Sequence, residues 1–118
     1  MSTIIGYDNF ILPAKDLVEA KEFYQNKLSL EIKFEFYEKE MIALKAGDNE
    51  PAFILRKAEN LRPTIMLKVD SVKKSLKELQ EKGIQFIAEP IEINTGLYAE
   101  LQDPTGNKFA ITDYSKTQ

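Results

Sequence analysis

The chain has 118 residues, 43% of them hydrophobic and 30% charged, with a formal net charge of −3 and neither histidine nor cysteine. Without imidazole or thiolate it cannot build the usual zinc cluster, a facial triad centred on histidine, or a nucleophile activated by histidine. Nucleic acid is an unfavourable partner, because it calls for clustered lysine and arginine rather than a mildly acidic balance.

The remaining composition is typical of one ordinary globular domain over residues 1–118, a length that suffices for a buried core. The first residues lack the basic and apolar pattern of a signal peptide, and no apolar run of about 18 residues follows. The sequence therefore predicts a soluble cytoplasmic protein without a membrane partner.

The first half predicts a strand, a helix and three further strands. Asn9–Leu12 is a short apolar segment closed by Pro13. Asp16 is then placed to cap a helix that ends near Leu28. The three strands that follow are expected at Glu31–Tyr37, Met41–Ala46 and Ala52–Lys57.

Regular alternation divides the strand at Glu31–Tyr37 into an apolar and a charged face. The apolar face carries Ile32, Phe34 and Phe36, and the charged face carries Glu31, Lys33, Glu35 and Tyr37. The pattern alone leaves open which face lines a cavity and which meets solvent.

The second half repeats this order of elements. Thr64–Val69 is a strand, Asp70 or Ser71 caps the next helix, and Gly83 stops it. An offset of 55 residues lays the apolar positions of the first strand and helix on those of the second half. Three more strands are expected at Gln85–Ala88, Leu97–Gln102 and Lys108–Thr112, with a turn at Asp103–Asn107 before the last.

Three segments resemble the glyoxalase, bleomycin resistance protein and extradiol dioxygenase superfamily, also called vicinal oxygen chelate. They are Asn9–Leu17 with Phe23 and Tyr24 downstream, Thr64–Val72, and the closing Asp-Pro-Thr-Gly-Asn-Lys-Phe that begins at Asp103. The resemblance implies an α+β fold of two βαβββ modules, about 7–57 and 64–114. Each module would curve a mixed sheet with its helix on the outer face, and the two sheets would enclose a cup. It also implies a homodimer.

Enzymes of this superfamily hold a metal ion on the first and last strands of the modules. The resemblance carries those ligand positions onto Asn9, Thr64 and Ala110, and in the looser first half onto Ile54. None of these residues is histidine or glutamate, and two of them have no donor atom. We therefore expect no metal, no cofactor and no catalytic residue, and a protein that is more plausibly a binder than an enzyme.

The function that follows is metal-independent binding of a small, partly apolar molecule in the cup. The alternatives are a metal-dependent lyase, isomerase or dioxygenase with a rearranged oxygen-ligand site, such as Glu35 with Glu100, and a module whose cup is filled by its own side chains. Arg56 could clamp an anionic group, since its guanidinium is a planar fork. The expected ligand-binding residues are Asn9, Ile11, Arg56, Thr64, Met66, Tyr98 and Ala110.

Overall fold

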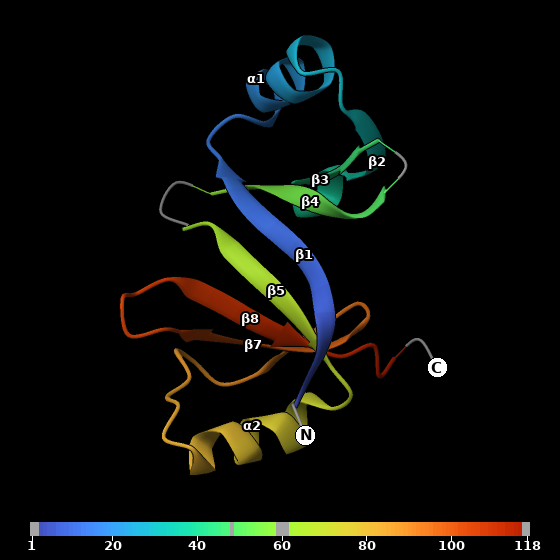
Figure 1. Cartoon of the computed structure of the whole chain (residues 1–118). Coiled ribbons are helices and arrows are strands. Elements are labelled where there is room, and N and C mark those ends of the chain that lie inside the picture. Colours follow the sequence, from blue (N-terminus) through green and yellow to red (C-terminus); the bar gives the residue numbers. More distant parts are fainter. Residues whose placement is uncertain (1–2, 48, 59–61, 117–118) are drawn as a thin grey trace. The chain divides into compact units, whose positions relative to one another are not determined.

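A computed structural model of the chain describes residues 3–47, 49–58 and 62–116 (Figure 1). The chain divides into two compact units, here called the first module (Asn9–Pro63) and the second module (Thr64–Gln118 together with Met1–Asp8). Each module contains one copy of the predicted order of strand, helix and three strands. The α+β class and the two βαβββ repeats are confirmed.

The first module places its strands in the order β2-β3-β4-β1, with β1 parallel to β4 and the other pairs antiparallel. β1 is longer than the predicted strand at both ends: it begins in the part of the chain assigned to the second module, and its pairing with β4 continues through Pro13 and Ala14. The elements are β1 (Ile4–Ala14), α1 (Leu17–Lys21) continued by a π-helix (Glu22–Lys27), β2 (Glu31–Phe36), a 3-10 turn (Tyr37–Lys39), β3 (Met41–Ala46) and β4 (Asn49–Lys57).

The predicted cap of α1 is present. The carboxylate of Asp16 accepts hydrogen bonds from the backbone N–H groups of Val18 and Glu19, at 2.9 and 3.2 Å. The helix ends at Leu28, whose N–H donates to the carbonyl of Phe23 at 3.0 Å in the wider π register. A local sequence signal at Asp16 therefore marks the start of this helix.

The core of the first module lies between α1 and one face of its sheet. Ile42, Leu44 and Leu55 are at most 1% exposed. Burial of a side chain of this size contributes about 1.5–3 kcal/mol to stability. The side chains packed around them include Leu12, Leu17, Ala20, Tyr24, Leu30, Ile32 and Phe53.

A β-bulge in β2 overturns the predicted alternation of that strand. Ile32 pairs with Leu44 and Phe34 pairs with Ala43, so Lys33 is an extra residue without a counterpart on β3. Because Leu44 and Ala43 are consecutive, Ile32 and Phe34 point to opposite faces. The prediction that Ile32, Phe34 and Phe36 share a face is wrong for Ile32.

The second module has the strand order β5-β8-β7-β6, with β5 parallel to β8. The strand predicted at Gln85–Ala88 is absent: Phe86 forms a single bridge with Leu101, and the short strand follows Pro90 instead. No helix within the described residues is long and apolar enough to cross a membrane. The elements are β5 (Thr64–Val69), α2 (Val72–Glu81), β6 (Ile91–Ile93), β7 (Gly96–Gln102) and β8 (Lys108–Thr112).

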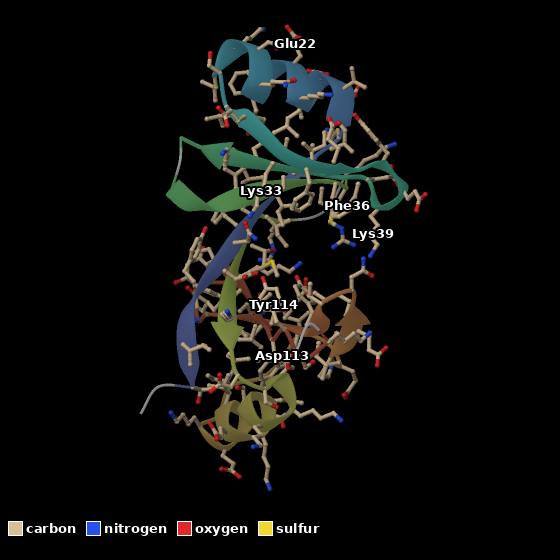
Figure 2. All side chains as sticks on the ribbon, turned by 90° about the vertical axis from the view of Figure 1, so that its right-hand side faces the viewer. Glu22, Lys33, Phe36, Lys39, Asp113 and Tyr114 are labelled. Carbon is tan, nitrogen blue, oxygen red and sulfur yellow. The ribbon has the colours of Figure 1, made fainter. Side chains whose placement is uncertain are left out.

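A single buried carboxylate, that of Asp113, connects three parts of the second module. It accepts hydrogen bonds from the N–H groups of Val72 at 2.8 Å and Leu97 at 3.0 Å, and from the hydroxyl of Ser115 at 2.8 Å. Ser71 caps the same helix through Lys74 N–H. Figure 2 shows Asp113 on the side of the sheet that carries α2. The contact fixes the start of α2 against β7 and the chain after β8.

The environment of Asp113 favours its charged form. Burial raises the pKa of this carboxyl, but the hydrogen bonds from Leu97, Val72 and Ser115 outweigh burial and hold the pKa below its ordinary value of 3.8. A carboxyl whose pKa is lowered by folding stabilises the folded state above its unfolded pKa. That contribution is lost as the pH falls through the folded pKa.

We predict that Asp113→Asn costs about 1–3 kcal/mol of unfolding free energy at pH 7, because two buried N–H groups lose a charged acceptor. Below about pH 4 the difference from the unmodified protein should shrink, since the unfolded chain is protonated at Asp113 first and the folded carboxyl only at lower pH. Urea unfolding between pH 2.5 and 7 measures both effects. Asp70→Asn, at an exposed position beside the same helix, is the matched control. A constant difference across this range would contradict the prediction.

We also predict that Gly96→Ala destabilises the second module by about 2–4 kcal/mol. A Cβ atom at position 96 would lie only 2.6 Å from the carbonyl oxygen of Asp113 and 2.9 Å from the nitrogen of Ser115. These are backbone atoms, so relieving the clash requires a shift of the main chain and costs stability. Gly6→Ala is the control, since a Cβ there has no neighbour within 4 Å. Thermal unfolding of the two variants should differ clearly, and equal midpoints would refute the packing argument.

Candidate functional site

The second module has one sheet face that α2 does not cover, which we call the second open face, although its Met66, Tyr98 and Ala110 side chains are at most 8% exposed. Cross-strand register identifies it, because Met66, Ala110 and Glu100 lie side by side while the intervening Ile111 and Ala99 belong to the core under α2. Three of the predicted site residues, Met66, Tyr98 and Ala110, are on this face, and Thr64 precedes Met66 by two residues. The face comprises Thr64, Met66, Lys68, Tyr98, Glu100, Lys108, Ala110 and Thr112.

A polar group of three side chains occupies the second open face beside Ala110. The hydroxyl of Tyr98 donates to Oε2 of Glu100 at 2.7 Å, and Nζ of Lys108 lies 2.9 Å from the same oxygen. The side chain of Lys108 is 11% exposed and that of Glu100 is 23% exposed. Limited access of water strengthens such interactions. The sequence singled out Tyr98, and the i, i+2 spacing along β7 was the available signal for Glu100 as its neighbour.

A second polar group on this module joins the two ends of the chain. The hydroxyl of Tyr114 donates to the carboxylate of Asp8, and Nζ of Lys68 lies 5.1 Å from the centre of the Tyr114 ring. Burial, followed by the hydrogen bond and charge of Asp8, raises the pKa of Tyr114 well above its ordinary value. The phenol therefore stays protonated and acts as a donor. Asp8 and Tyr114 are 106 residues apart, so no local sequence signal could reveal this contact.

The first module has a corresponding face turned away from α1, here called the first open face. Ile11 pairs with Ile54, which pairs with Ala43 and through it with Phe34. The next row is Pro13, Arg56, Met41 and Phe36. The predicted residues Ile11 and Arg56 are therefore on this face, and Asn9 precedes Ile11 by two residues on the same strand.

Asn9 contains a buried polar atom that requires explanation. Its Oδ1 is shielded from solvent and accepts no hydrogen bond from the residues that the structure describes. A buried acceptor in that condition costs about 1–3 kcal/mol. Among the predicted residues of the first module, Asn9 is therefore the one whose side chain has an acceptor atom that a ligand could satisfy. The set Asn9, Ile11 and Arg56 belongs to the first module, and the set Thr64, Met66, Tyr98 and Ala110 belongs to the second.

The residues at the four implied metal positions do not fit a metal ion. Ile54 and Ala110 have no donor atom, and Asn9 and Thr64 each offer one neutral oxygen. Within residues 3–47, 49–58 and 62–116 there is no group of three or more acidic side chains placed to hold a metal.

The rearranged pair of Glu35 with Glu100 does not fit either. Glu35 pairs with the core residue Ile42 and therefore faces α1, where Nζ of Lys21 lies 2.7 Å from its carboxylate. Hydrogen bonds from Lys21 and then Tyr37 lower the pKa of Glu35. Each carboxylate of the proposed pair thus already has a lysine partner.

Comparison with solved structures shows where the fold recurs. The chain is similar to methylmalonyl-CoA epimerase from Mycobacterium tuberculosis, with 13% identity, a TM-score of 0.74, and coverage of 95% of this chain and 89% of that one. A superfamily member from Vibrio splendidus 12B01 gives 16% identity, a TM-score of 0.68, and coverage of 88% and 95%. An extradiol ring-cleaving dioxygenase from B. fuscum gives 20% identity and a TM-score of 0.71, with coverage of 94% of this chain and 33% of that one.

These identities establish the fold and leave the activity open. A search of curated protein sequences found no significant match. The family model described as the glyoxalase/bleomycin resistance protein/dioxygenase superfamily matches residues 6–111, which span both βαβββ repeats. The chain therefore belongs to the glyoxalase/bleomycin resistance protein/dioxygenase superfamily.

Proposed function

We propose that this protein binds a small, partly apolar molecule on the second open face, without a metal ion. The observation that supports the proposal is that apolar side chains stand at implied metal-ligand positions. They lie beside the polar group of Tyr98, Glu100 and Lys108. Ala110 stands at a metal-ligand position implied by the family resemblance and Met66 is its cross-strand neighbour, while Tyr98, Glu100 and Lys108 lie next to them. Such a surface combines an apolar wall with a few oriented polar atoms, as ligand sites do.

The polar group favours a ligand that carries both donor and acceptor atoms and little net charge. Lys108 and Glu100 compensate each other's charge, so an added ion would have to separate them. Met66 can adapt to the shape of an apolar group because its side chain is unbranched and polarisable. Thr64 is a further polar side chain on this face, buried at the start of β5.

A metal-dependent lyase, isomerase or dioxygenase receives less support from these residues. The similar structures include an epimerase and a dioxygenase, but at 13% and 20% identity they share the fold alone. The carboxylates that could replace the missing ligands are bound to lysine. The homodimer implied by the family resemblance stays a prediction, which sedimentation velocity would test.

We predict that protein purified without chelator retains no stoichiometric Mg, Mn, Fe, Ni or Zn, because the donor set is too weak to hold them. Elemental analysis and equilibrium dialysis measure this directly.

A library of small apolar and aromatic compounds, screened by NMR, should contain ligands. These ligands should shift the resonances of Met66 and Ala110. Their affinity should be unchanged by EDTA.

Glu100→Gln tests the role of the polar group. It should weaken binding of those ligands about tenfold, since the ion pair with Lys108 would no longer orient the site. Glu92→Gln is the matched control, because Glu92 also has a lysine partner, Lys116 at 3.3 Å, but lies on β6 with an exposed side chain. One equivalent of tightly bound metal, or ligand shifts confined to other residues, would overturn the proposal.

A further inference from the structure

We infer that the first open face binds a planar aromatic carboxylate, with Arg56 holding the carboxylate and Phe34 and Phe36 packing against the ring. This site lies in the first module. It is therefore independent of the function proposed for the second module. Three observations carry the inference: the bulge in β2, the exposure of an aromatic pair, and cations without counterions.

The bulge at Lys33 reverses the polarity expected for β2. Beyond it, Glu35 faces α1 and the core, while Phe34 and Phe36 face away from the helix. If every residue of β2 paired regularly, without a bulge, both phenylalanines would lie with Ile32 under α1 and Glu35 would face outward. Folding stability alone favours the opposite arrangement, in which aromatic rings are buried under the helix. A local departure of this kind is expected where function requires it, and bulges are frequent beside binding sites.

The two phenylalanines form a partly exposed aromatic surface, since Phe36 is exposed and Phe34 is half-buried. Their ring centroids are 4.7 Å apart at an interplanar angle of 45°, and Phe36 is 47% exposed. Met41 lies opposite Phe36 on the neighbouring strand and extends the apolar surface. Phenyl rings and a thioether make a surface that suits a flat apolar group.

The cations beside this surface have no counterion among the described residues. Arg56 lies opposite Met41, one strand further from Phe36, and is exposed without an ion pair. Lys39 is likewise exposed and unpaired, and Figure 2 shows it with Phe36 on the side of the strands away from α1. In contrast, the adjacent Lys57 is 3.4 Å from Glu40. Positive charge at this end of the face is therefore available to an anion.

The chemistry of the ligand follows from these groups and their spacing. Arg56 offers a planar fork that accommodates a carboxylate with two parallel hydrogen bonds. Two strand spacings separate the backbones of Arg56 and Phe36, about 9–10 Å. A two-ring aromatic acid spans that distance. A neutral aromatic compound lacks a partner for Arg56, and a short aliphatic acid cannot reach the phenylalanines.

Naphthalene-2-carboxylate is the probe that tests the site, with naphthalene-2-carboxamide and acetate as matched compounds. Isothermal titration calorimetry should show binding of the carboxylate, and the amide and acetate should bind at least tenfold more weakly. Arg56→Gln should raise the dissociation constant of the carboxylate about tenfold to a hundredfold, the loss expected for a charged bidentate contact. Phe36→Leu should raise the same dissociation constant about threefold to tenfold.

Two controls separate this site from general effects of charge and aromatic content. Arg62→Gln removes the only other arginine, and Phe23→Leu removes another phenylalanine that is 47% exposed in the same module. Neither should change the affinity. Equal binding of carboxylate and amide, no binding of the carboxylate, or equal losses for Arg56→Gln and Arg62→Gln would overturn the inference. A dimer in sedimentation that Phe36→Asp dissociates, without naphthoate binding, would assign the face to a second copy of the chain and also overturn it.

Discussion

Parallel pairing between the first and last strands of each repeat is the constraint on which both open faces depend. It brings Ile11 beside Ile54 in the first module and Met66 beside Ala110 in the second. Since the strands that form each pair are distant in sequence, a helix and two further strands lie between them, and the pairing is a non-local contact. The register of these pairs then decides which side chains meet the helix and which remain on the open face.

The parts predicted correctly from the sequence are those that depend on local chemistry. Met41–Ala46, Thr64–Val69 and Lys108–Thr112 agree with the structure to the residue, and Asp16 caps the helix as expected. The bulge at Lys33 and the short strand after Pro90 were missed, since pairing with a neighbouring strand determines them. Asp113 was missed as well, because its partners Val72 and Leu97 lie 41 and 16 residues away.

In the candidate sites too, the sequence pattern indicates which residues share a strand face, but not which side chains contact each other across the fold. Among the expected ligand-binding residues, Met66 and Ala110 share one face of the second module, and Ile11 and Arg56 share one face of the first. The sequence pattern gave no indication that Glu100 is bound by Lys108, or that Glu35 turns toward Lys21. Those lysine contacts matter for function, because a carboxylate engaged with an ammonium group is a poor ligand for a cation. The weak donors at the four implied metal positions and the lysine contacts of Glu35 and Glu100 are therefore consistent with each other.

The extra residue in β2 has an evolutionary consequence. Deletion of Lys33 would remove the bulge but leave Phe34 opposite Ala43 and Phe36 opposite Met41, so both phenylalanines would stay on the first open face. Regular pairing of the full-length strand would instead shift the stretch after Ile32 by one register position and turn both phenylalanines toward α1. Related chains of equal length could therefore gain or lose an aromatic surface through strand register alone, without substituting any residue on it. Sequence comparison by identity would overlook that change, whereas comparison of strand pairing would reveal it.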